Sequence, residues 1–290
     1  MNKFKKIGFI GAGKAGFTLG KYFKERDANV TGYYSRNPQS AEEAAEFTNT
    51  VCFESPGQIL ANSDVLFLTV PDSQIETVWN SLKPFSMSNK LICHCSGALS
   101  SSVFDGIEQM KAFGYSVHPL FAFSSKLTSY KEMAQTLFTI EGHDRHLYNL
   151  KVFIEQAGNP VHIIAPENKI KYHASAVFFS NHVTALAHIG CKLLYECGFN
   201  NKFAEIVLKT LFLNHCGAIA KSGPVKALTG PVERNDLSTV KKHMACLEKN
   251  ESQLYALLSK ALIEISKEKH IDSDYSAMEQ LIYKEMEQLL

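Results

Sequence analysis

The sequence predicts an α/β domain with a doubly wound, mostly parallel sheet, followed by an all-α domain. Strand-like and helix-like segments alternate through the first half of the chain, which is the pattern of βαβ units. After Ala165-Pro166 only helical patterns follow. A chain of 290 residues is long enough for two cores, so domains are predicted at residues 1–165 and 166–290.

The predicted strands of the first domain are short runs of apolar and β-branched residues. They cover residues 6–10, 29–34, 50–53, 64–70, 91–95, 115–118, 136–140 and 161–164. The run at 64–70 is almost continuously apolar, which is typical of a parallel strand buried on both faces. Helices are expected at 15–26 and 40–47, and Ser55-Pro56 has the residues of a helix N-cap and first helical position.

The second domain contains helical patterns only. They cover residues 171–197, 201–221, 236–248, 251–269 and 274–289. Gly198 follows the first of them and is the expected C-cap residue, because glycine adopts the left-handed conformation without strain.

The composition excludes several classes of partner. Hydrophobic residues make up 45% and charged residues 20% of the chain, and the formal net charge is +1. This balance provides no excess of lysine and arginine for nucleic acid or an anionic membrane. No apolar run is expected to reach membrane-spanning length, and the basic start at residues 1–6 leads into a strand rather than a signal-peptide core. A cytoplasmic location is therefore predicted.

Cys93-His94-Cys95 resembles a fragment of a metal site. In a strand, the two sulfurs lie on one face and the imidazole on the other. No second ligand pair follows at zinc spacing, so the fragment is interpreted as structural and no metal is predicted.

A glycine motif indicates a dinucleotide site. It consists of Gly11, Ala12, Gly13, Lys14, Ala15 and Gly16, directly after a predicted strand and at the start of a helix. In this context Gly11 permits the tight turn, Gly13 leaves room for a pyrophosphate, and Gly16 allows the helix to pack closely on the sheet. The helix N-terminus then binds the phosphates. The motif predicts a Rossmann domain, and a glycine-rich turn without a ligand is the alternative.

The end of the second strand favours NADP over NAD. An acidic residue about twenty positions after the motif would bind the ribose hydroxyl of NAD. Ser35, Arg36 and Asn37 occupy this region instead, and they suit a 2′-phosphate. The alternative is that Arg36 is only a solvated turn residue.

Two further loops follow strands at the carboxyl edge, where open α/β sheets bind ligands. Val70, Pro71 and Ser73 come from the first loop, and Ser96 and Gly97 from the second. These residues are expected to face the ribose and nicotinamide. For Ser73 and Ser96, a role as helix caps or turn residues is an equal alternative.

The chain resembles the Rossmann-like DUF2520 family of NADP oxidoreductases, within the 6-phosphogluconate dehydrogenase-like superfamily that includes pyrroline-5-carboxylate and ketopantoate reductases. The motifs that carry the resemblance are Gly11–Gly16, Val70-Pro71-Asp72, Cys95-Ser96-Gly97, His118-Pro119, Tyr172-His173-Ala174-Ser175-Ala176, Ser180-Asn181, Thr229-Gly230-Pro231, Arg234 and Asp236. The resemblance spans nearly the whole chain. It implies NADP as cofactor, and by analogy a homodimer formed through the helical domain.

The predicted helix at 171–197 carries the first candidates for catalysis. His173, Ser180 and Asn181 fall on one stripe at helical spacing, which Thr184 and His188 extend. A polar stripe is expensive to bury without a purpose. His173 is expected to exchange a proton with the substrate, while Ser180 and Asn181 orient it. A hydrogen-bonded seam between helices is the alternative, and it is preferred for Thr184 and His188.

His118 is a second acid–base or substrate-contact candidate, because Pro119 holds it extended at a strand end. A buried histidine satisfied by backbone is the alternative. Thr229 and Arg234 lie in a polar turn between helices and are candidate substrate contacts, and Asp236 is expected to cap the next helix.

One departure weakens a specific hydroxyacid reaction. The β-hydroxyacid dehydrogenases of the superfamily use a lysine on this helix with an asparagine four residues later. Here Lys169 and Lys171 are followed by His173 and Ser175. The leading hypothesis is therefore an NADP-dependent oxidoreductase acting on a small polar carbonyl or imine, or on the matching hydroxy or amino compound. The alternatives are a non-catalytic NADP-binding sensor or partner-binding protein, and a reductase that uses a deazaflavin.

Overall fold

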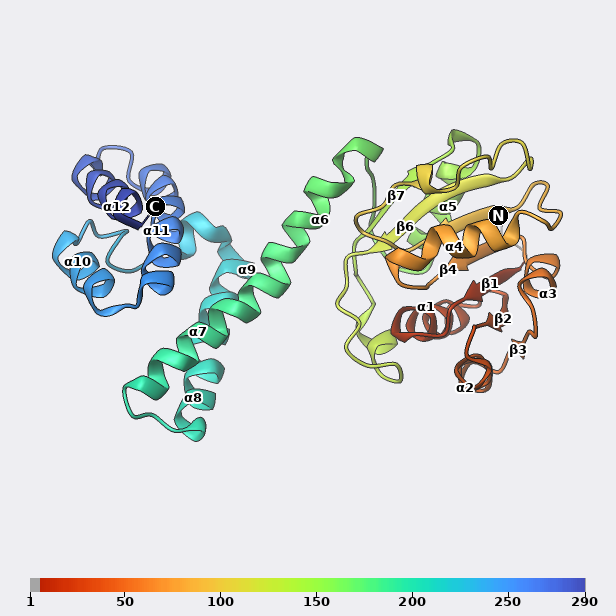
Figure 1. Cartoon of the computed structure of the whole chain (residues 1–290), viewed down its shortest axis with the longest axis horizontal. Helices are drawn as coiled ribbons and strands as arrows, with labels where there is room; N and C mark the ends of the chain where they lie inside the picture. The colour runs from red at the N-terminus through yellow and green to blue at the C-terminus, as the bar shows by residue number, and fades with distance from the viewer. Residues whose placement is uncertain (1–5, 290) are drawn as a thin grey trace. The chain divides into compact units, whose positions relative to one another are not determined.

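The computed structural model describes residues 6–289, and its course is drawn in Figure 1. The chain divides into two compact units between Ser180 and Asn181. Residues 1–5, which form most of the basic start of the chain, lie outside the described residues.

The first unit is built on an eight-stranded sheet with the order β3-β2-β1-β4-β5-β6-β7-β8. The strands are β1 (Ile7–Ile10), β2 (Val30–Tyr34), β3 (Val51–Cys52), β4 (Val65–Leu68), β5 (Leu91–His94), β6 (Phe113–Pro119), β7 (Phe138–Gly142) and β8 (Val161–Ile163). Only the pair β6–β7 is antiparallel among these neighbours. The first six positions follow the Rossmann order, so the predicted doubly wound, mostly parallel sheet is confirmed.

Helices connect these strands, and two more helical segments, η3 and α6, follow the last strand. They are α1 (Lys14–Lys24), α2 (Pro38–Thr48), α3 (Pro56–Ala61), α4 (Asp72–Leu82), α5 (Asp144–Gln156) and α6 (Lys169–Val177), with the short 3₁₀ helices η1 (Ser101–Val103), η2 (Ser129–Glu132) and η3 (Pro166–Asn168). Ser55 caps α3 as predicted, because its side chain accepts a hydrogen bond from the Gln58 amide at 3.3 Å.

The sheet buries both of its faces. Successive residues of β4 alternate between two cores: Val65 and Phe67 belong to one, Leu66 and Leu68 to the other. The first core contains buried residues of α1, α2 and α5, and the second contains those of α3 and α4. This period-two division explains why the predicted strand at 64–70 is apolar throughout.

The second unit is helical. Its elements are the π-helices η4 (Phe178–His182) and η5 (Leu208–Phe212), together with α7 (Val183–Glu196), α8 (Asn201–Val207), α9 (Leu213–Ala227), α10 (Leu237–Cys246), α11 (Lys249–Lys269) and α12 (Ser276–Leu289). The boundary between the units falls inside η4. Gly198 has a φ of +87°, as expected for the residue after the end of α7.

The core of the second unit lies among α10, α11 and α12. It contains Val232, Val240, Met244, Ala256, Ile263, Tyr275, Met278 and Ile282. The described residues of α7 and α9 are all at least partly exposed.

The expectation that no apolar run reaches membrane-spanning length is wrong in this unit. The helical stretch Asn201–Ala227 has the length and composition to cross a membrane, with a mean hydropathy of 1.3. Only 6% of that apolar window is buried. The polar residues of the stretch are spaced widely enough for its apolar character to persist through α8, η5 and α9.

Candidate functional site

The glycine turn after β1 has the geometry that its three glycines predict. Gly11 has a φ of +105°, and a Cβ built on it would lie 2.8 Å from the Thr69 carbonyl oxygen. A Cβ on Gly16 would lie 2.2 Å from the Gly11 carbonyl oxygen, so α1 packs directly on the turn. A Cβ on Gly13 would meet no atom within 4 Å. Gly13 therefore faces open space, as a close approach by a pyrophosphate requires.

A cavity of about 420 Å³ opens beside this turn at the carboxyl edge of β1, β2 and β4. It is lined by Ile10, Gly11, Ala12, Gly13, Tyr34, Ser35, Arg36, Asn37, Pro56, Thr69, Val70, Pro71, Gln74, Thr77, Val78 and Ser81. The cavity thus combines predicted residues from three loops. Its position between β1 and β4 is where the strand order reverses, the usual ligand site of an open α/β sheet.

Other predicted cofactor residues lie next to this cavity rather than in its lining. Lys14, Ala15 and Gly16 form the first turn of α1, and Ser73 lies in the first turn of α4. Eight lining residues were missed, and Ile10, Tyr34, Pro56 and Thr69 are four of them. The other four, Gln74, Thr77, Val78 and Ser81, lie on α4. Their spacing of three, four and seven residues places them on one face of α4, and this was the available signal.

The loop after β5 is fixed by charged side chains from other elements. The Ser96 hydroxyl donates to the Asp72 carboxylate at 2.6 Å, and it accepts from the amides of Ala98 and Leu99. The Glu141 carboxylate accepts from the amide and the hydroxyl of Ser101, at 2.6 and 2.8 Å. These bonds give Ser96 a structural role in its own turn.

Lys169 holds the same loop from α6. Its side chain is only 1% exposed, and Nζ donates to the Ser96 carbonyl at 3.0 Å and to the Ser116 hydroxyl. Burial lowers the pKa of Lys169, while the nearby Glu141 raises it. The sequence did not single out this role, since a lysine near a helix start is usually solvated and no local pattern reveals a tertiary contact.

Two of the predicted catalytic residues come together beside Gly97. The ring centroids of His118 and His173 lie 6.3 Å apart. A Cβ on Gly97 would lie 2.5 Å from His173 Cδ2 and 2.9 Å from His118 Nε2. The absent side chain of Gly97 thus allows both imidazoles to approach the loop that Lys169 holds.

Tyr172 completes this cluster and was not predicted as a site residue. Its hydroxyl lies 2.9 Å from Nδ1 of His118. Burial raises the pKa of Tyr172. Burial, followed by the charge of Lys169, lowers the pKa of His118 to about 3. His118 is consequently a neutral imidazole near pH 7.

Ser180 and Asn181 lie in η4, a π-helix that changes the helical period within the predicted stripe. The Ser180 hydroxyl donates to the Ala176 carbonyl at 2.7 Å. Ser180 and Asn181 are both exposed. A π-turn contains more residues than an α-turn, so positions beyond it rotate away from the face that a period of 3.6 predicts. Thr184 and His188 are exposed as well. The stripe is therefore not buried, and the cost of burying polar groups gives no reason to assign it a function.

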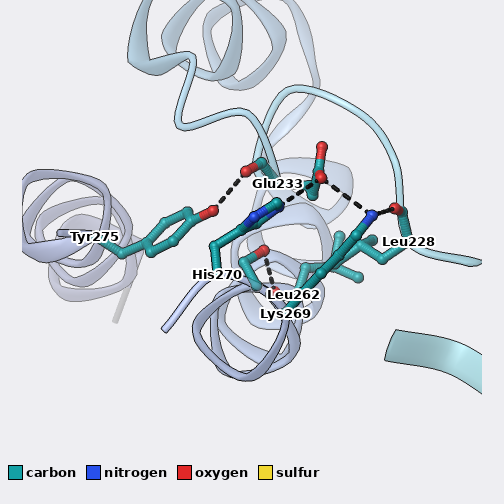
Figure 2. Close-up of polar contacts among 7 residues, drawn as sticks. Leu228, Glu233, Leu262, Lys269, His270 and Tyr275 are labelled. Carbon is teal, nitrogen blue, oxygen red and sulfur yellow. Dashed lines mark hydrogen bonds and ion pairs between the residues drawn. The ribbon is translucent and has the colours of Figure 1, made fainter. Parts of the chain in front are cut away.

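Figure 2 shows the polar contacts of Glu233, which lies between Thr229 and Arg234 in the sequence. Glu233 accepts from Nε2 of His270 at 2.7 Å and pairs with Lys269 at 3.1 Å. Thr229 and Arg234 themselves are exposed. Asp236 caps α10 as predicted, because its carboxylate accepts from the Thr239 amide at 3.0 Å.

Cys93 and Cys95 are free thiols on the side of the first core, whereas the His94 ring packs against Phe104 of the second. Burial raises the pKa of Cys95 to about 12. Residues 6–289 contain no group of three histidine, cysteine or acidic side chains arranged to hold a metal ion.

Comparisons with known proteins agree with the fold and with the predicted cofactor class. Residues 6–96 match the family described as NADP oxidoreductase, coenzyme F420-dependent. Residues 136–262 match a domain of unknown function, DUF2520. The resemblance drawn from the motifs is confirmed, and so is NADP as the cofactor class of the matched family. No curated protein matches the chain.

Solved structures share the fold across most of the chain. Protein TM1727 from Thermotoga maritima is 28% identical, with a TM-score of 0.74 over 91% of this chain and 99% of that one. BF3122 from Bacteroides fragilis, assigned as an NADP oxidoreductase, is 22% identical, with a TM-score of 0.69 over 90% and 99% of the two chains. A Plasmodium falciparum pyrroline carboxylate reductase with NADP bound is 15% identical, with a TM-score of 0.56 over 92% and 98%.

Proposed function

Since the chain unites an NADP oxidoreductase region with a DUF2520 region, we propose that it transfers a hydride between NADP and a small polar carbonyl or imine compound, in either direction. The observation that carries this proposal is the cavity in which the glycine turn meets Ser35, Arg36 and Asn37. A pyrroline carboxylate reductase of the same fold provides the precedent for an imine.

The residues of the cavity suit the two charged parts of the dinucleotide. The space above Gly13 and the amides at the start of α1 fit a pyrophosphate. Arg36 is exposed at the cavity wall, where its guanidinium can bind a 2′-phosphate through two hydrogen bonds. Ser35 and Asn37 add a hydroxyl and an amide to the same subsite.

The chemistry is assigned to the cluster beside Gly97. NADP supplies the hydride when bound, and the protein supplies orientation and a proton. His173 is the proton donor or acceptor in this proposal, and His118 contacts the substrate. Ser180 and Asn181 remain candidates for orienting it, as do Thr229 and Arg234. The printed description of the matched family names coenzyme F420, so a deazaflavin is the second candidate hydride partner.

Titration with NADPH and NADH by calorimetry tests the cofactor assignment. Wild type is expected to bind NADPH at least tenfold more tightly, or about 1.4 kcal/mol. Arg36→Ala removes this difference, whereas Arg145→Ala, which removes an exposed guanidinium from α5, keeps it. Absence of binding to either nucleotide would overturn the proposal. Binding without turnover of F420, carbonyl or imine compounds would favour a sensor.

We further propose that the protein is a cytoplasmic homodimer formed through the helical unit. Large apolar side chains are exposed along α7, α8, η5 and α9. They include Leu186, Tyr195, Phe203, Ile206, Leu211 and Leu213, together with Phe199 in the loop between α7 and α8. Exposed apolar surface on this scale is typical of an interface. A second copy of the chain is the occupant that the superfamily resemblance supports.

A further inference from the structure

The contact between Tyr172 and His118 determines which nitrogen of the imidazole carries the proton. A neutral histidine has one donor and one acceptor nitrogen, and the partner of one nitrogen sets the role of the other. A protonated phenol is a better donor than acceptor toward an imidazole nitrogen. The Tyr172 hydroxyl lies 2.9 Å from Nδ1. This preference favours donation from the phenol to Nδ1, with the proton of His118 on Nε2.

The Nε2 atom faces the loop after β5, which the sequence predicts to border the nicotinamide. It faces Gly97, where an added Cβ would lie 2.9 Å away. The loop that contains Gly97 is held by Lys169 and Asp72 through Ser96. A donor on this side of the ring thus has a fixed position.

The groups that face His118 oppose a positive charge on its ring. Lys169 and His173 approach from α6, and His94 approaches from β5. A neutral imidazole is retained while a nearby group exchanges a proton, so His118 can polarise a carbonyl or imine without itself titrating near pH 7.

We propose that Tyr172 is a positioning residue that holds neutral His118 in the Nε2–H tautomer, so that His118 donates a hydrogen bond to the substrate oxygen or nitrogen beside Gly97. This inference rests on the proposed oxidoreductase function for its substrate. It divides the work between the two histidines: His118 orients and polarises the reacting group, while His173 exchanges the proton.

The tautomer can be measured without substrate or cofactor. The protein is labelled with ¹⁵N-histidine, and His118 is identified by the signal that disappears in His118→Gln. At pH 7 the wild-type signal is expected to be that of a neutral Nε2–H ring, and to stay so down to pH 5. Tyr172→Phe, which keeps the ring of residue 172, shifts it toward the other tautomer. An Nδ1–H or doubly protonated ring in wild type, or a spectrum that Tyr172→Phe leaves unchanged, would overturn the proposal.

Two matched substitutions of His118 test the contact with the substrate. His118→Gln keeps an amide N–H near the Nε2 position, whereas His118→Asn places its amide near Nδ1. We expect His118→Asn to lower kcat/KM about 100-fold and His118→Gln clearly less, in keeping with loss of one preorganised donor. Equal losses in both variants would contradict the role of Nε2. If no turnover is found in wild type, the oxidoreductase function fails, while the tautomer measurement still decides the role of Tyr172.

Discussion

Two substitutions in the glycine turn have different expected effects. Gly13→Ala should weaken cofactor binding, whereas Gly16→Ala should lower the stability of the fold. The two glycines are three residues apart, but their surroundings differ. A Cβ on Gly13 meets no atom within 4 Å, and Gly13 has φ −80° and ψ −171°, a conformation that alanine adopts freely. A Cβ on Gly16 would lie 2.2 Å from a backbone oxygen and 2.8 Å from the Thr69 side chain.

The expected magnitudes follow from these contacts. Gly13→Ala changes the free energy of unfolding by less than about 1 kcal/mol, with stabilisation as the favoured direction because the unfolded chain loses freedom. Gly16→Ala lowers it by about 1–3 kcal/mol, since α1 must move away from the turn. NADPH binding responds differently from stability. The methyl group of Gly13→Ala occupies the space for the pyrophosphate and weakens NADPH binding at least tenfold, or by about 1.4 kcal/mol.

Urea denaturation and calorimetric titration on the same preparations provide both quantities. If Gly13→Ala binds NADPH as tightly as wild type, the pyrophosphate lies elsewhere and the role given to Gly13 is wrong. If Gly16→Ala is as stable as wild type, the close packing of α1 on Gly11 is absent in solution.

Three further predictions concern stability and assembly. Folded His118 has a pKa of about 3, so between about pH 6.5 and pH 5 only the unfolded state binds a proton at this residue. The free energy of unfolding of wild type should therefore fall by about 2 kcal/mol between pH 7 and pH 5 because of this group. Denaturant titration should show that this loss is absent in His118→Gln. Leu211→Glu should convert the proposed dimer to a 32.3 kDa species in analytical ultracentrifugation, whereas Tyr148→Glu, at a site that is likewise 70% exposed, should leave the dimer intact. Ser55→Ala should lower the unfolding free energy by about 1 kcal/mol, through loss of the cap on Gln58, and an unchanged denaturation midpoint would show that the cap is dispensable.

The fold was predictable because its signals are local. A strand, a glycine turn and a helix follow one another within residues 7–24, and the caps at Ser55 and Asp236 need only neighbouring amides. The lining of the cavity was predictable in part for the same reason, since Ser35, Arg36 and Asn37 directly follow β2. Parallel strands bring the ends of such loops to one edge without further information.

The remaining features depend on contacts between distant segments or on a change of helical period. Lys169 is buried because Ser96 and Ser116, more than 50 positions earlier, accept hydrogen bonds from its ammonium group. The π-helix at Phe178–His182 shifts the register of the predicted polar stripe, and no residue type in this segment indicates a π-helix. The apolar stretch at Asn201–Ala227 was overlooked because polar residues interrupt it, although none ends the helix.

The absence of a Lys-x-x-x-Asn pair takes on a different meaning once Lys169 is located. Lys169 is followed four residues later by His173, so a basic group and a polar group still share one face of α6. The ammonium is turned to Ser96 and Ser116, where it fixes the loop and opposes protonation of His118. We infer that the lysine stabilises the site while the two histidines act on the substrate. A Lys169→Met variant should therefore raise the pKa of His118 toward its usual range in the ¹⁵N titration. A His118 pKa that does not change in this variant would show that burial alone keeps the ring neutral.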